Sequence, residues 1–155
     1  LEHKELWQLA GEVDTEAPPA ELGVAERLRA GHDLTLVTWS RMRHVCAEAA
    51  ETLAAEGIGA ELFDLRTLWP WDREAIFASV RRTGRLLVAH EAVRTAGLGA
   101  EIVVSATEAL FAELKAPPVR LGGPRAPTPF SKPLEDLHRV SAADVAAAAR
   151  RLVRG

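Results

Sequence analysis

The sequence predicts a three-layer α/β/α domain built on a mostly parallel β-sheet. Three short apolar segments (residues 34–39, 61–65 and 85–89) have strand character, and a segment with helical apolar spacing follows each of them. Three strand-helix units in a row favour a parallel sheet with helices on both faces, because crossovers between parallel strands are right-handed. Periodicity alone does not give the order of the strands.

Length and composition agree with one soluble globular domain. The chain has 155 residues, of which 48% are hydrophobic and 26% charged. Folding at this length hides roughly two thirds of the extended chain's surface, so neither a disulfide nor a metal is needed for stability. The single cysteine, Cys46, lies at an apolar position of an expected helix and is interpreted as a small buried hydrophobe. Without a CxxC pair or a Cys/His cluster, the sequence argues against a zinc or redox site.

Charge and hydropathy exclude two classes of partner. The formal net charge is -3, so the chain lacks the basic character of a nucleic-acid binder. The apolar runs are far shorter than the ~20 residues of a membrane span, and no secretory signal opens the chain. We therefore expect a cytoplasmic protein, or a mitochondrial matrix protein in a eukaryote, with neither nucleic acid nor membrane as partner.

The first 20 residues have the composition of a linker. Residues 1–9 mix apolar and charged side chains, and residues 11–19 are acidic and contain prolines. Because no strand or helix-capping signal opens the chain, we expect residues 1–20 to lead from a preceding domain of about 180 residues, a size set by ordinary domain length. The domain proper is expected to span residues 21–155.

In the first expected strand, residues 23–29, apolar and polar side chains alternate weakly. A glycine-containing turn and the apolar strand of residues 34–39 follow it. A helix is then expected over residues 42–55, because Val45, Ala49 and Leu53 recur at helical spacing. Gly57 ends this helix. Residues 61–65 form the next buried strand.

The second helix has clear start and stop signals. Asp72 is expected to be its N-cap, a contact that usually contributes about 1 kcal/mol. Gly84 is expected to end it in the left-handed conformation. A strand over residues 85–89 and a glycine-rich loop running to Gly99 should follow.

The last third of the chain predicts a helix, a strand, a loop and a final helix. Apolar residues recur at helical spacing from Ile102 to Leu114 and predict a helix there. Residues 118–121 are expected to form the last strand. Residues 122–136 contain four prolines and are expected to form an irregular loop. Ser141 should cap the final helix, with Asp144 completing a capping-box pair. The side chains of this helix that should face the core are Val145, Ala148, Ala149 and Leu152.

His90 and Glu91 lie at the carboxyl end of an expected central strand, the edge where α/β sheets place ligand-binding side chains. No suitable nucleophile or further metal ligand accompanies them, which favours a packed or interface histidine over a direct chemical role. If the strand continues through both residues, their side chains point to opposite faces of the sheet.

Two further motifs leave alternatives open. Gly97 and Gly99 open a helix after a strand, where a phosphate can bind, but the third glycine or lysine of a nucleotide motif is absent, which favours a structural turn. Arg66, Trp69 and Trp71 lie in a loop at a strand end. Exposed indoles there would indicate an interface; alternatively, the indoles cover the core and Arg66 pairs with a carboxylate.

Four segments in this order and spacing carry a family resemblance: residues 34–39, 64–72, 83–92 and 97–102. Together they resemble the C-terminal, transketolase-type domain of E1 β subunits of thiamine-diphosphate-dependent 2-oxo acid dehydrogenases, which act on pyruvate, branched-chain 2-oxo acids or acetoin. Residues 1–7 are similar to the segment that leaves the pyrimidine-binding domain in that family. Residues 116–120 and 127–130 match its last strand and the following loop.

The resemblance implies a five-stranded mixed sheet in which residues 23–29 form an antiparallel edge strand. It also implies an assembly role, with contacts to the E1 α subunit, a second β chain and the peripheral subunit-binding domain of the E2 acyltransferase. In the family, the cofactor-activating glutamate and the active-site histidines belong to the preceding domain, and the α subunit holds the diphosphate and Mg²⁺. No catalytic, cofactor-binding or metal-binding residue is therefore carried over, and the chain alone is expected to be catalytically silent. The expected assembly surface comprises Arg66, Trp69, Trp71, His90, Glu91 and Val93.

A different hypothesis is a free-standing α/β module that binds a small molecule or an anion through the Gly97 to Gly99 turn.

Overall fold

A five-stranded β-sheet forms the middle layer of the fold. The structure is a computed structural model that describes residues 3–155. Its strands lie in the order β1-β3-β2-β4-β5, and β1 runs antiparallel to β3 while the other neighbouring pairs are parallel. Their bounds are β1 (Glu26–Arg29), β2 (Leu34–Thr38), β3 (Ala60–Asp64), β4 (Leu86–Val93) and β5 (Val119–Gly123). The expected mixed sheet with one antiparallel edge strand is confirmed.

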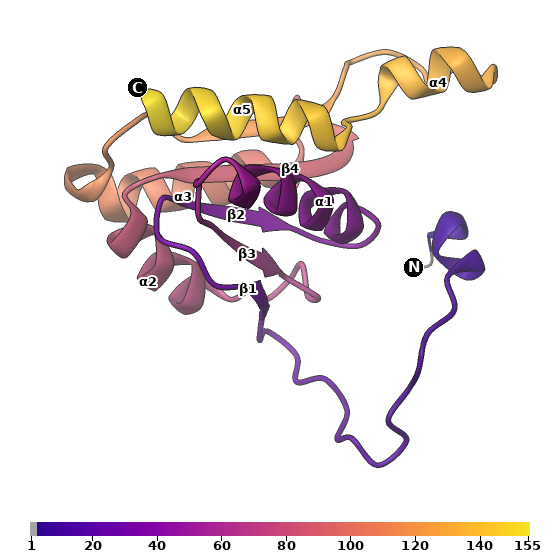
Figure 1. Cartoon of the computed structure of the whole chain (residues 1–155), viewed down its shortest axis with the longest axis horizontal. Coiled ribbons are helices and arrows are strands. Elements are labelled where there is room, and N and C mark those ends of the chain that lie inside the picture. The colour runs from indigo at the N-terminus through magenta and orange to yellow at the C-terminus, as the bar shows by residue number, and fades with distance from the viewer. Residues whose placement is uncertain (1–2) are drawn as a thin grey trace.

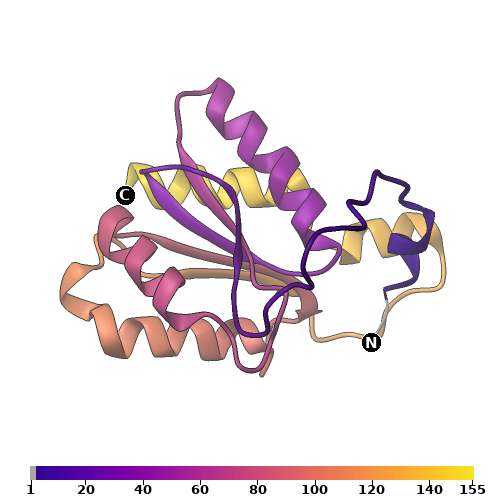
Figure 2. The ribbon, with the colours of Figure 1, turned by 90° about the horizontal axis from the view of Figure 1, so that it is seen from below.

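Two pairs of helices cover the two faces of this sheet (Figures 1 and 2). α1 (Met42–Ala55) and α5 (Ala142–Arg154) pack on one face, and α2 (Arg73–Thr83) and α3 (Leu98–Leu110) pack on the other. Because successive strand residues point to opposite faces, Leu36 belongs to the core under α1 and α5 while its neighbour Val37 belongs to the core under α2 and α3. The three-layer arrangement is confirmed.

Small side chains bring α1 and α5 close together. Ala49 and Ala50 of α1 and Ala148 and Ala149 of α5 all lie in one buried cluster. Cys46 is also buried there, and burial raises the pKa of its thiol to about 12. The interpretation of Cys46 as a small hydrophobe is therefore confirmed.

The strand order reverses between β2 and β4. From β2 the chain passes through α1 to β3 on one side, and from β3 it crosses through α2 back to β4 on the other side. Open α/β sheets form a crevice at such a reversal, beyond the carboxyl ends of the strands. A binding site is therefore expected at this edge of the sheet.

The predicted ends and capping residues of three helices are confirmed. α1 has the expected bounds. The Asp72 side chain caps α2, and Gly84 follows it at φ 71°. The capping box between Ser141 and Asp144 is present at α5. The four core-facing side chains predicted for α5 are all buried.

Three expectations about the second half of the chain were wrong. β4 does not end at Ala89 but continues to Val93, because Val93 pairs with Gly123 of β5. Residues 122–136 are not wholly irregular, since α4 (Lys132–His138) begins there. Pro133 lies in the first turn of α4, where its missing N–H costs nothing. α3 begins at Leu98, within the turn expected to open it, but it ends at Leu110, and the 3₁₀ turn η2 (Phe111–Glu113) replaces its expected continuation to Leu114.

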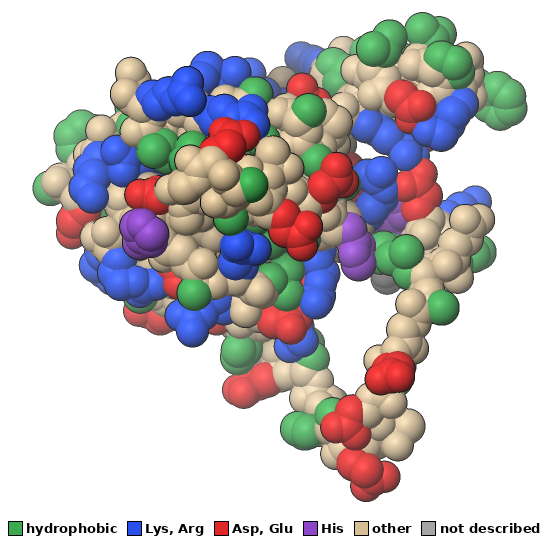
Figure 3. Space-filling view, in the orientation of Figure 1, with side chains coloured by type: hydrophobic (Ala, Val, Ile, Leu, Met, Phe, Trp, Pro, Cys, Tyr) green, Lys and Arg blue, Asp and Glu red, His purple; other side chains and the backbone are tan. Residues whose placement is uncertain are grey.

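The N-terminal segment leaves the body of the domain and returns to it (Figure 1). The 3₁₀ helix η1 (Lys4–Gln8) lies near the carboxyl edge of the sheet, and residues 9–21 are exposed, with acidic side chains along them (Figure 3). The composition of residues 3–20 suits a linker, but η1 is attached to the domain by ion pairs. No helix within residues 3–155 has both the length and the apolar character needed to cross a lipid bilayer.

Candidate functional site

A cavity of about 650 Å³ lies at the carboxyl edge of the sheet, where the strand order reverses. Its walls come from the ends of β2, β3 and β4 and from the N-terminal segment. The lining residues are His3, Trp39, Ser40, Asp64, Arg66, Leu68, Glu91 and Ala92. The sequence-predicted candidates Arg66 and Glu91 therefore meet in one place, although they are 25 positions apart in the numbering.

Backbone turns just after β2 and β3 shape this cavity. Ser40 and Arg66 both have φ 56°, in the left-handed region that costs a residue with a side chain roughly 1–2 kcal/mol. The Asp64 carboxylate supports the second turn by accepting a hydrogen bond from the Arg66 N–H at 3.1 Å. Both chain segments are thereby turned sharply at the rim of the sheet.

A small ion-pair cluster fixes the Arg66 side chain. Arg66 and Arg43 each contact Glu26 Oε2 at 2.9 Å, and Arg43 also reaches Asp64 Oδ2 at 3.3 Å. The interpretation in which Arg66 pairs with a carboxylate is therefore correct. Arg43 and Asp64 were not predicted; Asp64 could have been found from its position at the end of a buried strand.

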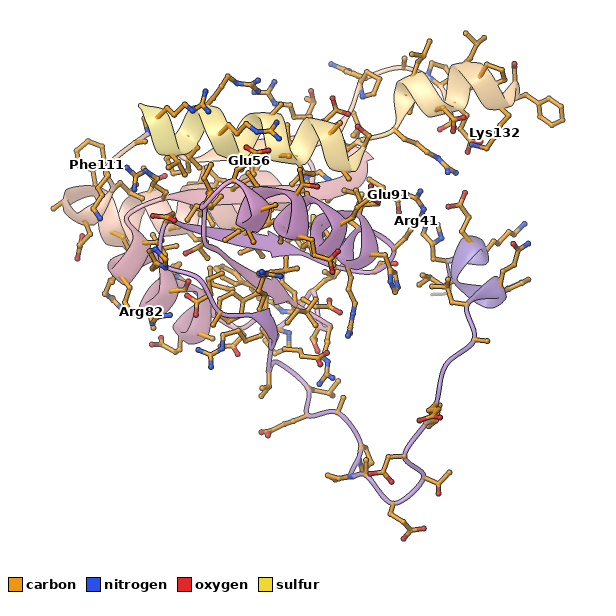
Figure 4. The ribbon with its side chains drawn as sticks, in the orientation of Figure 1. Arg41, Glu56, Arg82, Glu91, Phe111 and Lys132 are labelled. Atoms are coloured by element: carbon orange, nitrogen blue, oxygen red, sulfur yellow. The ribbon has the colours of Figure 1, made fainter. Side chains whose placement is uncertain are left out.

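A second ion-pair network attaches η1 to the same edge. Glu91 contacts His3 Nε2 at 2.8 Å and Arg41 Nη1 at 3.2 Å, and Arg41 also pairs with Glu5. Glu5 in turn pairs with Arg139 at 2.5 Å, and this hydrogen bond, with the Arg41 charge, lowers the pKa of Glu5. Figure 4 shows Arg41 and Glu91 on the side of the domain that faces η1.

His90 is enclosed behind this cavity. Its side chain is fully buried, and its ring stacks on Trp39 with centroids 5.2 Å apart and planes 12° from parallel. A Cβ atom added at Gly97, Gly99 or Gly122 would lie 2.8, 2.5 or 2.9 Å from the ring, so only glycine leaves room for it. The glycines of the 97–99 turn therefore have a packing role.

The environment of His90 favours the neutral imidazole. Neither ring nitrogen has a hydrogen-bond partner within residues 3–155. Burial lowers the pKa of His90; the nearby Ala92 backbone opposes this effect, and the Arg120 charge adds to it. A charged His90 would be costly in this position.

The expected assembly surface needs correction, because two of its six residues are buried. His90 has no exposed surface, and Trp71 is only 5% exposed, packing edge-on against Phe77 with ring centroids 5.8 Å apart. Trp69, by contrast, is 80% exposed. The side chains that reach the surface are Arg66, Trp69, Glu91 and Val93.

The side chains at this edge are not arranged to bind a diphosphate together with Mg²⁺. Within residues 3–155 no three His, Cys, Asp or Glu side chains are placed to share a metal ion. The Glu91 carboxylate already pairs with His3 and Arg41, and the His90 ring is sealed from the cavity by Trp39 and the glycines.

Comparison with known proteins gives consistent findings. The family model described as "Transketolase, C-terminal domain" matches residues 23–145. The β subunit of acetoin:2,6-dichlorophenolindophenol oxidoreductase from Cupriavidus necator is 44% identical over 154 residues, which cover 99% of this chain and 46% of that protein. The pyruvate dehydrogenase E1 component subunit beta of Porphyra purpurea is 42% identical over 135 residues, covering 87% and 41% of the two chains.

A solved structure described as a split-gene transketolase, an inactive β4 tetramer, superposes with a TM-score of 0.74 at 32% identity. The match covers 93% of this chain and 46% of the other. The chain thus spans less than half the length of these relatives.

Proposed function

The chain belongs to the transketolase C-terminal domain family, and from this premise we propose that it is the non-catalytic assembly domain of a 2-oxo acid dehydrogenase E1 β subunit. The parent enzyme would use thiamine diphosphate to decarboxylate a 2-oxo acid oxidatively and would pass the acyl group to the lipoyl group of E2. In this proposal the chain contributes contacts to the E1 α subunit and to a second β chain. It also offers a docking surface to the peripheral subunit-binding domain of E2.

The exposed indole of Trp69 is the observation that carries the proposal. It is 80% exposed in the loop after β3, which also carries Arg66, and Glu91 and the 39% exposed Val93 lie at the end of β4 on the same edge of the sheet. Apolar area in water costs about 25 cal/mol per Å², so burial of an indole against a partner is favourable. Tryptophan and arginine are both enriched in protein interfaces.

Other large apolar side chains are exposed on different parts of the molecule. Phe111, at the end of α3, is 77% exposed and lies at the opposite end of the domain from Glu91 (Figure 4). Phe130 and Leu137, before and within α4, are 105% and 83% exposed. The proposal assigns these exposed side chains to contacts with different partners.

Sedimentation velocity over a range of chain concentrations tests the contact with a second copy. We expect concentration-dependent association that Trp69→Ser weakens. Val13→Ser is the matched control, because Val13 is 81% exposed but lies in the N-terminal segment away from the carboxyl edge. Association that both variants weaken equally would argue against a specific role of Trp69.

Titration of the chain with a purified E1 α subunit and with a purified E2 peripheral subunit-binding domain tests the other partners. Trp69→Ser should weaken at least one of these interactions, while Val13→Ser should leave both unchanged. A chain that stays monomeric and binds neither protein would contradict the assembly proposal. The proposal keeps the expected compartment, the cytoplasm or the mitochondrial matrix of a eukaryote, and it includes neither nucleic acid nor a membrane as partner.

A further inference from the structure

A second cavity, of about 530 Å³, lies at the carboxyl ends of β4 and β5, farther along the same edge of the sheet. It is formed by the loops that follow β4 and β5, the end of α4 and one face of α5. It shares no lining residue with the first cavity. The charged and titratable residues that line it are Arg94, Arg125, His138, Arg139, Asp144 and Arg151.

Three of these arginines are free to bind a ligand. Within the described part of the chain, Arg94, Arg125 and Arg151 form no ion pair, whereas Arg139 is paired with Glu5 and Glu135. The Asp144 carboxylate accepts hydrogen bonds from the Ser141 N–H and hydroxyl at 2.9 and 2.6 Å, which lower its pKa. The cavity therefore has an excess of positive charge in a chain whose net charge is -3.

Hydrogen bonds hold the backbone around Arg94 and Arg125 in place. The Arg94 N–H donates to the Gly123 carbonyl at 2.9 Å, and the Arg94 carbonyl accepts from Arg120 Nη1 at 2.5 Å. A hydrogen bond from the Ala126 N–H to the Pro124 carbonyl at 2.9 Å closes a tight turn around Arg125. Arg151 lies on α5, where cationic side chains gather in Figure 3. Such preorganisation reduces the entropy lost when a ligand binds.

We infer that this cavity binds a compact ligand that carries two or more negative charges on phosphate or carboxylate groups. Guanidinium groups match the oxygen geometry of both groups with paired hydrogen bonds. The volume lies within the 300–1,000 Å³ typical of small-molecule sites. Bringing three like charges together is unfavourable without a counter-ion, and the ligand supplies one.

A small anion fits better than an extended polyanion. Extended polyanions such as nucleic acids bind along basic stripes, whereas this chain is acidic overall and the three unpaired arginines all line one cavity. The inference does not depend on the assembly role, because it uses neither Trp69 nor the lining of the first cavity.

Calorimetric titration of the chain in magnesium-free buffer tests the site with pyrophosphate, citrate and inorganic phosphate. We expect saturable binding of one equivalent of pyrophosphate or citrate, with inorganic phosphate weaker. Comparison of pyrophosphate with citrate identifies whether phosphate or carboxylate is preferred. Arg125→Gln and Arg151→Gln should each weaken binding about 10-fold, the effect of losing one charge-assisted hydrogen bond.

Arg81→Gln is the control, since Arg81 is an exposed arginine of α2 outside this cavity. A second readout is thermal unfolding. Arg125→Gln should raise or preserve the melting temperature without ligand, because it relieves like-charge repulsion, and should reduce the rise that pyrophosphate causes.

Two results would overturn the inference: no saturable binding of any of the three anions, or equal weakening by Arg81→Gln and Arg125→Gln.

Discussion

Asp72 links two distant parts of the chain, because its Oδ2 atom accepts a hydrogen bond from the Ala25 N–H at 2.9 Å while Oδ1 accepts from the Ala75 N–H at 3.0 Å. The first bond holds the segment that enters β1, and the second caps α2. Another contact joins the same two segments, from the Gly23 N–H to the Thr67 hydroxyl at 3.2 Å. The edge strand is therefore anchored through the start of α2.

Asp72→Ala should cost more than the loss of an ordinary helix cap. It removes two hydrogen bonds to backbone donors, so we expect a decrease of about 2–3 kcal/mol in the free energy of unfolding. Ser141→Ala, which removes only the cap of α5, should cost about 1 kcal/mol. Urea denaturation of both variants measures the difference. Equal losses would mean that the bond to Ala25 does not contribute.

His90 should make stability depend on pH between about 7.5 and 5.5. Its folded-state pKa is lowered, so the unfolded chain binds more protons, and stability is lost as pH falls below the ordinary histidine pKa of about 6.5. The urea midpoint should therefore be lower at pH 5.5 than at pH 7.5, and His90→Asn should reduce this difference. His44→Asn is the control, because His44 is exposed. If His90→Asn shows the same pH dependence as the original chain, His90 is not the group that causes it.

Gly99→Ala should destabilise the domain although alanine is the better helix former. The new Cβ would lie 2.5 Å from the His90 ring, so the ring or the helix must move, at a cost of about 1–3 kcal/mol. Gly11→Ala should change nothing measurable, because a Cβ there has no neighbour within 4 Å. Thermal unfolding of the two variants provides the test. A Gly99→Ala variant as stable as Gly11→Ala would mean that the packing around His90 is loose.

Glu5→Gln should release η1 while leaving the domain folded. Glu5 pairs with both Arg41 and Arg139, and exposed ion pairs of this kind contribute up to about 1 kcal/mol each. Amide hydrogen exchange of residues 4–8 should become faster, and the global unfolding midpoint should hardly change. Glu12→Gln, in the exposed segment, should not affect exchange in η1. Equal exchange in the two variants would show that Glu5 does not hold η1.

The chain supplied with thiamine diphosphate, Mg²⁺ and a 2-oxo acid should release no carbon dioxide. Thiamine catalysis requires a carboxylate against the pyrimidine, a metal that holds the diphosphate and a cleft with little water. The described residues offer no three-donor metal site, and Glu91 is already paired. Calorimetry should show no cofactor binding that requires Mg²⁺. Mg²⁺-dependent saturable binding would contradict the assembly-domain proposal.

Local signals in the sequence were sufficient for several elements. Asp72, Gly84 and Ser141 act through backbone groups a few residues away, so their capping roles can be predicted without knowledge of the fold. The extension of β4 could not be predicted, because it depends on pairing with Gly123 of β5, 30 residues beyond Val93 in the numbering.

The site was predicted less well, because burial there depends on distant segments. Gly97, Gly99 and Gly122 come from two loops, and only their convergence shows that His90 is enclosed. Trp69 and Trp71 lie two positions apart in one loop, and nothing local indicates that only Trp71 packs against Phe77. The sequence did place Arg66 and Glu91 at the edge of the sheet where they line one cavity, since the ends of parallel strands meet there.

The enclosure of His90 also restricts the order in which its neighbours can evolve. While the imidazole is present, a methyl group at position 97, 99 or 122 has no room, so each such substitution alone is selected against. A smaller residue at position 90 removes the conflict at position 99, where the ring alone is in the way. A Cβ at position 97 or 122 would still lie 2.6 or 2.8 Å from the carbonyl oxygen of Val93 or Ala92. Positions 90 and 99 should therefore show strong epistasis, with the histidine changing first along any viable mutational path.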